Sequence, residues 1–97
     1  MTGNDLNAWL AATKTGRAPR RAFVCPDGFS VSIQASSYHY CSPRDDDGPY
    51  TSVELGFPSK VVESLMPYAK EPDQPTGTVY GWVPVDAVAD VLTKHGA

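Results

Sequence analysis

The segment that most constrains the fold of this chain is RRAFVCPDGFSVSIQA, residues 20–35. Its centre holds Pro26, Asp27 and Gly28, a combination typical of a tight turn. Proline presets φ, aspartate bonds its own backbone, and glycine accepts a positive φ. From Phe29 to Ala35 apolar and polar residues alternate, which is the pattern of a half-buried strand. The segment therefore predicts an antiparallel hairpin with a tight turn.

A second hairpin is predicted directly after the first. Residues 36–42 (SSYHYCS) and 50–57 (YTSVELGF) are strand-like, and the breaker-rich segment PRDDDGP lies between them. Pro43 and Pro49 fit the ends of a wide loop, because proline cannot donate a ladder hydrogen bond from inside a sheet. In the later strand, one face carries Val53, Leu55 and Phe57, and the other carries Ser52 and Glu54. The predicted tip of this hairpin is Asp45, Asp46 and Asp47.

Three short helices and one more strand complete the predicted elements. The predicted helix caps are Asn4 or Asp5, Ser59 and Asp86, and the predicted ends are Gly16, Pro67 and Gly96. The segment TVYGWVPV, residues 78–85, predicts a strand in which Gly81 marks a bulge or a close backbone approach. The sequence therefore predicts an α+β fold, with three short helices packed on a mostly antiparallel sheet of two hairpins plus one strand.

The length and hydropathy of the chain limit its organisation. Its 97 residues fit one domain, residues 1–97. No apolar run approaches the roughly 20 residues of a membrane span, and residues 1–12 lack the pattern of a signal peptide. We therefore expect no membrane partner and a soluble protein of the cytoplasm.

The charges are distributed unevenly along the chain, whose net charge is −3. Residues 1–24 hold four basic side chains and one acidic one, whereas the chain from Asp45 onward holds nine acidic and three basic ones. This asymmetry is compatible with an acidic face that repels nucleic acid and attracts a basic partner, or with a solvated surface of mixed sign. Direct binding of nucleic acid through Arg17, Arg20 and Arg21 is not expected, because the rest of the chain opposes it.

The two cysteines predict structural thiols, with a zinc site as the alternative. Cys25 and Cys41 are too few for a disulfide framework and are expected to be free and buried. Zinc needs about four ligands, for which Cys25, His39, Cys41 and His95 are the candidates. A nucleophilic Cys41 with His39 as base is a further alternative, but no oxyanion-hole motif accompanies it. We expect neither a cofactor nor an enzymatic activity.

The aspartate run and the tyrosines around it predict a contact surface. The acids lack the spacing of a calcium-binding loop, and three loop aspartates are usually only solvated. Tyrosines, however, provide a large contact area at low entropic cost, and carboxylates attract a basic partner. The predicted partner-binding residues are Tyr38, Tyr40, Tyr50, Asp45, Asp46, Asp47 and Glu54. The two tryptophans, Trp9 and Trp82, are expected to be core or half-core anchors.

The segments VCPDGFSVSIQASSYHYCSPRDDDGPYTSVELGFPS and TVYGWVPVDAV resemble a group of small proteins carried by phages and bacterial mobile elements. The resemblance covers about Arg21 to Gly96, and size and acidity suggest a further similarity to anti-CRISPR proteins of type I systems. It implies a non-enzymatic inhibitor, a monomer or homodimer in the bacterial host cytoplasm. Such an inhibitor would bind the CRISPR-Cas surveillance complex (Cascade). Its acidic, DNA-mimicking surface would occupy the basic channel that receives target DNA.

Overall fold

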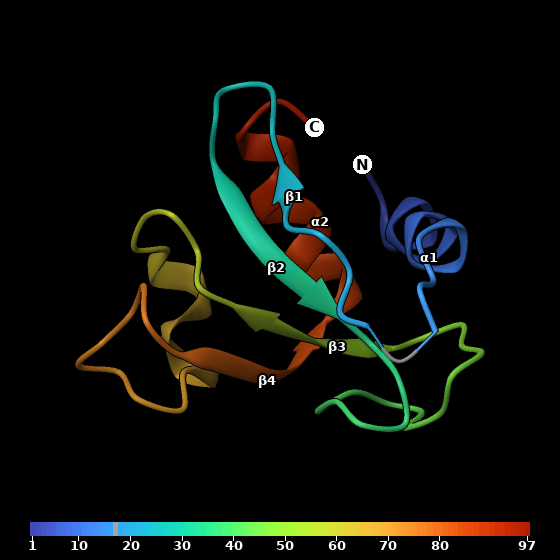
Figure 1. Ribbon diagram of the computed structural model, residues 1–97. Helices are drawn as coiled ribbons and strands as arrows, with labels where there is room; N and C mark the ends of the chain where they lie inside the picture. The colour runs from blue at the N-terminus through green and yellow to red at the C-terminus, as the bar shows by residue number, and fades with distance from the viewer. Residues whose placement is uncertain (17) are drawn as a thin grey trace.

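The computed structural model describes residues 1–16 and 18–97 and has an α+β fold, as predicted (Figure 1). Its elements are α1 (Gly3–Ala12), β1 (Phe23–Val24), β2 (Ser30–Gln34), β3 (Ser52–Gly56), the 3-10 helix η1 (Glu63–Tyr68), β4 (Val79–Pro84) and α2 (Val85–Lys94). The strands form one antiparallel sheet in the order β1-β2-β3-β4. In Figure 1, α2 lies behind β1 and β2, and α1 packs beside α2.

The first predicted hairpin is confirmed. Phe23 pairs with Val31 and Val24 with Ser30 across an antiparallel ladder. The backbone N–H of Phe29 donates to Asp27 Oδ1 at 2.9 Å, and Gly28 has a φ of +93°. Asp27 and Gly28 therefore have the roles in the turn that the sequence predicts.

The second predicted hairpin is wrong, because residues 36–42 form no strand. Strand β3 pairs with β2 on one edge, where Gln34 opposes Glu54, and with β4 on the other. With both edges of β3 occupied, residues 36–42 pair with this strand only through an isolated bridge between Ser42 and Ser52. Phe57, predicted to share a face with Val53 and Leu55, lies beyond the end of β3 and is exposed.

The three helices form near their predicted positions but start differently. The cap of α1 is Thr2, and the predicted cap Asp5 instead completes a capping box with it. Ser59 caps no helix; its hydroxyl accepts a hydrogen bond from the N–H of Ser30 at 3.0 Å, and η1 contains Pro67 instead of ending before it. Helix α2 begins after Pro84 without a side-chain cap, and Asp86 lies in its first turn.

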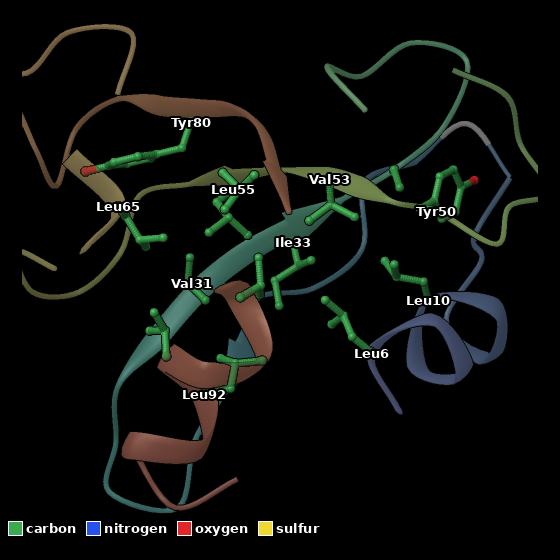
Figure 2. Close-up of a cluster of buried hydrophobic side chains, with 14 of the residues drawn as sticks. Leu6, Leu10, Val31, Ile33, Tyr50, Val53, Leu55, Leu65, Tyr80 and Leu92 are labelled. Carbon is green, nitrogen blue, oxygen red and sulfur yellow. The ribbon is translucent and has the colours of Figure 1, made fainter. Parts of the chain in front are cut away.

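One apolar cluster joins the helices to the sheet (Figure 2). Helix α1 contributes Leu6 and Leu10, α2 contributes Leu92, and the strands contribute Ile33 and Val53. Figure 2 shows Leu65 of η1 near Tyr80 at one end of the cluster and Tyr50 near Leu10 at the other. None of the helices within residues 1–16 and 18–97 is long and apolar enough to cross a membrane.

Candidate functional site

The connection from β2 to β3 folds back against the sheet as an irregular loop. We call residues 36–50 the contact loop; it includes most of the predicted partner-binding residues and lies at the lower right of Figure 1. Tyr40 joins it to two strands: its N–H donates to Glu54 Oε1 at 3.1 Å, and its carbonyl accepts from the N–H of Trp82 at 3.0 Å. Irregular loops longer than about 12–15 residues are uncommon in compact domains and are usually functional if they are ordered.

Tyr50, predicted to be a contact residue, lies in the core and anchors the loop there. Its side chain is only 4 % exposed, and its hydroxyl donates to the carbonyl of Asp45 at 2.8 Å. Its backbone N–H and carbonyl both bond to the side-chain amide of Asn7 in α1, at 2.6 and 2.9 Å. Burial raises the pKa of the phenol. Tyr50 therefore holds the loop and offers no surface to a partner.

The three aspartates are exposed but also have partners within the chain. Asp45 Oδ1 accepts from the N–H groups of Asp47 and Gly48 at 3.0 and 2.9 Å, and these bonds hold the pKa of Asp45 below its usual range. Asp46 Oδ1 accepts from the N–H of Ser37 at 2.9 Å. The carboxylate of Asp47 lies 3.3 Å from Nζ of Lys14, which follows α1 in the chain. The Asp47 side chain is 91 % exposed. The aspartates thus present fixed negative charges on an internally bonded loop.

Two of the remaining predicted contact residues are at the surface. Tyr38 is 67 % exposed. Tyr40 is half-buried, packs at 4.9 Å between ring centroids against Trp82, and has the guanidinium of Arg44 5.8 Å from its ring centroid. Both residues are therefore accessible at the surface of the contact loop.

Trp82 and Arg44 belong to this surface but are missing from the prediction. Trp82 was expected as a core or half-core anchor; its side chain is 51 % exposed and its φ is +51°. Such a conformation costs a non-glycine residue roughly 1–3 kcal/mol. The sequence signal for this conformation was Gly81, which predicts a bulge. The β3–β4 pairing does shift its register between Val53 and Leu55, opposite Gly81 and Trp82. The other tryptophan, Trp9, is half-buried and packs edge-on against Phe23.

The cysteines occupy separate, buried places. Cys25 precedes the β1–β2 turn, while Cys41 lies in the contact loop with its thiol 3.2 Å from the carbonyl of Ser36. Burial raises the pKa of both thiols, which disfavours the thiolate that a nucleophile or a zinc ligand requires. His39 Nδ1 bonds to the hydroxyl of Ser36 at 2.6 Å. No group of three or more His, Cys, Asp or Glu side chains within residues 1–16 and 18–97 could hold a metal ion, so no three of the candidate zinc ligands Cys25, His39, Cys41 and His95 come together.

The basic and acidic residues are spread over the molecule. Arg20 is buried, and its guanidinium donates to Thr13 Oγ1 and to the carbonyls of Leu10 and Ala35, so it serves the fold. Arg21 is exposed, and Arg17 lies outside the described residues. Residues 70–77, which hold further acids, lie at the end of the sheet opposite the contact loop in Figure 1. The acidic half of the chain therefore forms no single face.

Comparison with known proteins does not assign this chain to a family. No protein-family model, curated protein or solved structure matches the chain. The resemblance to phage-carried inhibitors therefore stays a prediction.

Proposed function

We propose that this chain is a non-enzymatic protein-binding domain that acts through the contact loop. The observation that carries the proposal is the construction of this loop: it is anchored by Tyr50 and Cys41 in the core, yet it keeps Tyr38 and the carboxylates of Asp45, Asp46 and Asp47 exposed. A loop already held by internal bonds loses little conformational entropy on binding, and this favours affinity.

The narrower proposal is inhibition of a type I CRISPR-Cas surveillance complex, and it rests on the resemblance of the sequence. Three adjacent carboxylates attract a Lys- and Arg-lined channel, speed the encounter and fix the register of the complex. Since the acids of the chain are scattered, the proposed DNA mimicry is confined to the contact loop, with Glu54 beneath Tyr40 as a supporting residue. Nucleic acid itself is not the proposed partner.

The test uses the purified chain and a purified, guide-loaded type I surveillance complex. We expect the chain to bind the complex and to reduce its binding of target DNA in a mobility-shift assay, with weaker binding at higher salt. A variant with Asp45→Asn, Asp46→Asn and Asp47→Asn keeps a hydrogen-bond acceptor at each position and removes only the charges. We expect it to bind more weakly and with a smaller dependence on salt.

A matched control removes three charges elsewhere, with Glu71→Gln, Asp73→Asn and Asp90→Asn, all at exposed positions. It should bind as the unaltered chain does. Equal binding by all three proteins would refute the role of the contact loop. An absence of any binding to the complex would refute the CRISPR-related proposal.

A further inference from the structure

A groove of about 440 Å³ runs along β4, the edge strand of the sheet, between the contact loop and η1. Three of its seven lining residues are aromatic, and the lining comes from three separate segments of the chain. The loop contributes Tyr40, η1 contributes Pro67 and Tyr68, and β4 contributes Val79, Gly81 and Trp82. We call it the aromatic groove.

The backbone edge of β4 is already used beside this groove. The N–H of Lys70 donates to the carbonyl of Val79 at 3.0 Å, and the N–H of Trp82 donates to the carbonyl of Tyr40 at 3.0 Å. A partner strand therefore cannot pair with these groups to extend the sheet. A ligand in the groove must be recognised by side chains.

The aromatic side chains of the groove keep their polar groups free. The buried hydroxyls of Tyr50 and Tyr80 donate to the backbone carbonyls of Asp45 and Pro75. By contrast, the side-chain donors of Tyr40, Tyr68 and Trp82 have no hydrogen-bond partner within residues 1–16 and 18–97; the two hydroxyls are not buried, and Trp82 as a whole is 51 % exposed. The groove thus combines flat apolar faces with three donors available to a ligand.

The backbone of β4 directs Trp82 into this position. Val53 pairs with Val83 and Leu55 with Tyr80, so β4 has one more residue than β3 between these pairs. The buried side chains of Tyr80 and Val83 are separated by Gly81 and Trp82, which are not buried. A Cβ at Gly81 would make an ordinary contact with Tyr40 Cβ at 3.4 Å, so Tyr40 lies directly against this position of β4. A bulge of this kind re-aims a side chain, and here it exposes a tryptophan at a positive φ that no core contact requires.

The charges at the groove select its occupant. Lys70 lines the groove, and Arg44 lies over the ring of Tyr40. Neither residue forms a salt bridge with another of the described residues. Two cations beside an apolar floor therefore complement a ligand that is apolar at its centre and acidic at its ends.

We propose that the aromatic groove binds an extended, proline-containing segment of the partner protein that also carries acidic residues. A polyproline II segment has no internal hydrogen bonds, so its carbonyls can accept from Trp82, Tyr40 and Tyr68 while its proline rings pack on the aromatic faces. Lys70 and Arg44 then pair with the acids. The inference rests on the proposed function, because it names the chemistry of a segment that the protein-binding domain would recognise.

Single-stranded nucleic acid is the competing occupant, because bases also stack on aromatic side chains. It fits less well, since affinity for nucleic acid comes largely from many phosphate contacts. The groove has one cation in its lining, Lys70, and a second, Arg44, over the ring of Tyr40, and the chain as a whole carries a net charge of −3. Nucleic acid is therefore one of the outcomes that the test must be able to detect.

The test follows the indole N–H signal of Trp82 by NMR while short synthetic peptides are added to the full chain. The first peptide contains prolines flanked by glutamates, the second has alanine in place of each proline, and the third has lysine in place of each glutamate. We expect a saturable shift with the first peptide and affinities at least about tenfold lower with the other two. The indole of Trp9, which packs against Phe23, is the internal control and should not shift.

Variants measured by calorimetry with the first peptide locate the site. We expect Trp82→Ala to weaken binding at least about tenfold, as truncation of a central aromatic contact does. Phe57→Ala is the matched control, because Phe57 is also an exposed aromatic residue at a positive φ and does not line the groove. Tyr68→Phe removes only the hydroxyl donor and should weaken binding several-fold. Lys70→Glu should reduce the preference for the glutamate peptide over the lysine peptide.

Each contrary result assigns the groove differently. Equal affinity for the proline and alanine peptides would overturn the proposal, as would no shift with any peptide. A larger response to oligothymidine would assign the groove to nucleic acid, and a concentration-dependent shift without peptide would assign it to a second copy of the chain. If the chain binds none of the peptides but still binds the surveillance complex in a way that depends on Asp45, Asp46 and Asp47, only this inference is refuted. The opposite pattern would refute the proposed use of the contact loop.

Discussion

Two turn regions of this protein use the same residue types and are held by different means. The β1–β2 turn contains Pro26, Asp27 and Gly28, and the contact loop also combines prolines, aspartates and a glycine. In both, an aspartate accepts a hydrogen bond from a backbone N–H two residues later: Asp27 from Phe29 and Asp45 from Asp47. Local hydrogen bonding by aspartate is thus common to both.

The difference lies in where the other hydrogen bonds go. Around the short turn the backbone hydrogen bonds stay local, since the N–H of Cys25 donates to the carbonyl of Phe29 and the N–H of Gly28 donates to that of Cys25, and only the Asp27 side chain also bonds to a distant residue, His95. The contact loop is held by distant residues instead: Asn7 of α1 bonds to Tyr50, and Trp82 of β4 bonds to Tyr40. A short turn is therefore specified by its own residues, whereas an ordered loop depends on the rest of the fold.

The largest expected effect comes from removing the core anchor of the contact loop. Tyr50→Ala deletes a buried aromatic ring and should lower the free energy of unfolding by ~3–5 kcal/mol, the range found for large aromatic-to-alanine changes in cores. Chemical denaturation followed by circular dichroism measures it. Tyr38→Ala in the same loop removes an exposed ring and should change stability by less than about 0.5 kcal/mol. Similar values for the two variants would show that the loop is not anchored through Tyr50.

A smaller effect is expected from the link between α1 and the loop. Asn7→Ala leaves the backbone N–H and carbonyl of Tyr50 without their partners in a partly buried place. The expected loss is about 1–3 kcal/mol, the cost of leaving such groups unpaired. Amide hydrogen exchange at Tyr50 should accelerate in parallel.

Asn4→Ala provides the matched control for this measurement. Asn4 lies in the same helix and is exposed, so the gain in helix propensity is similar and no loop contact is lost. If the amide hydrogen of Tyr50 exchanges at the same rate in both variants, Asn7 does not stabilise the loop.

The contrast explains which parts of the fold could be predicted. The hairpin at Pro26–Gly28 and the strand around Gly81 follow from residues that are adjacent in sequence, and the structure has both. The failed strand at residues 36–42 has a suitable composition, but β3 already pairs with β2 and β4. Which segments pair with a strand depends on the whole sheet, so the sequence of residues 36–42 alone does not show that β3 is already paired on both edges.

The same reasoning applies to the candidate site. The exposure of Tyr38 and the aspartates agrees with a surface loop, as their sequence context predicts. The burial of Tyr50 depends on α1, whose Asn7 lies 43 positions earlier, and the exposure of Trp82 depends on one extra residue in β4. Both outcomes depend on register and packing, which a single sequence does not display.

The smallest expected effect concerns acid and the short turn. The N–H of Phe29 and the hydrogen bond with His95 Nδ1, at 2.6 Å, lower the pKa of Asp27 below its ordinary value. A carboxylate with a lowered pKa in the folded state stabilises the fold above its ordinary pKa, and this stabilisation is lost as the pH falls through the folded value. The unaltered chain should therefore lose this contribution from about pH 4 downward.

Asp27→Asn tests this because it keeps a side-chain acceptor for Phe29 and removes the titrating group. The variant should be less stable than the unaltered chain near neutral pH, and the difference should shrink as the pH falls through the acid range. Asp90→Asn, at an exposed position of α2, should instead follow the pH dependence of the unaltered chain. Thermal unfolding across this range measures the difference. If the difference in stability between the Asp27→Asn variant and the unaltered chain were the same at every pH, the charge of Asp27 would not contribute to the stability of the turn.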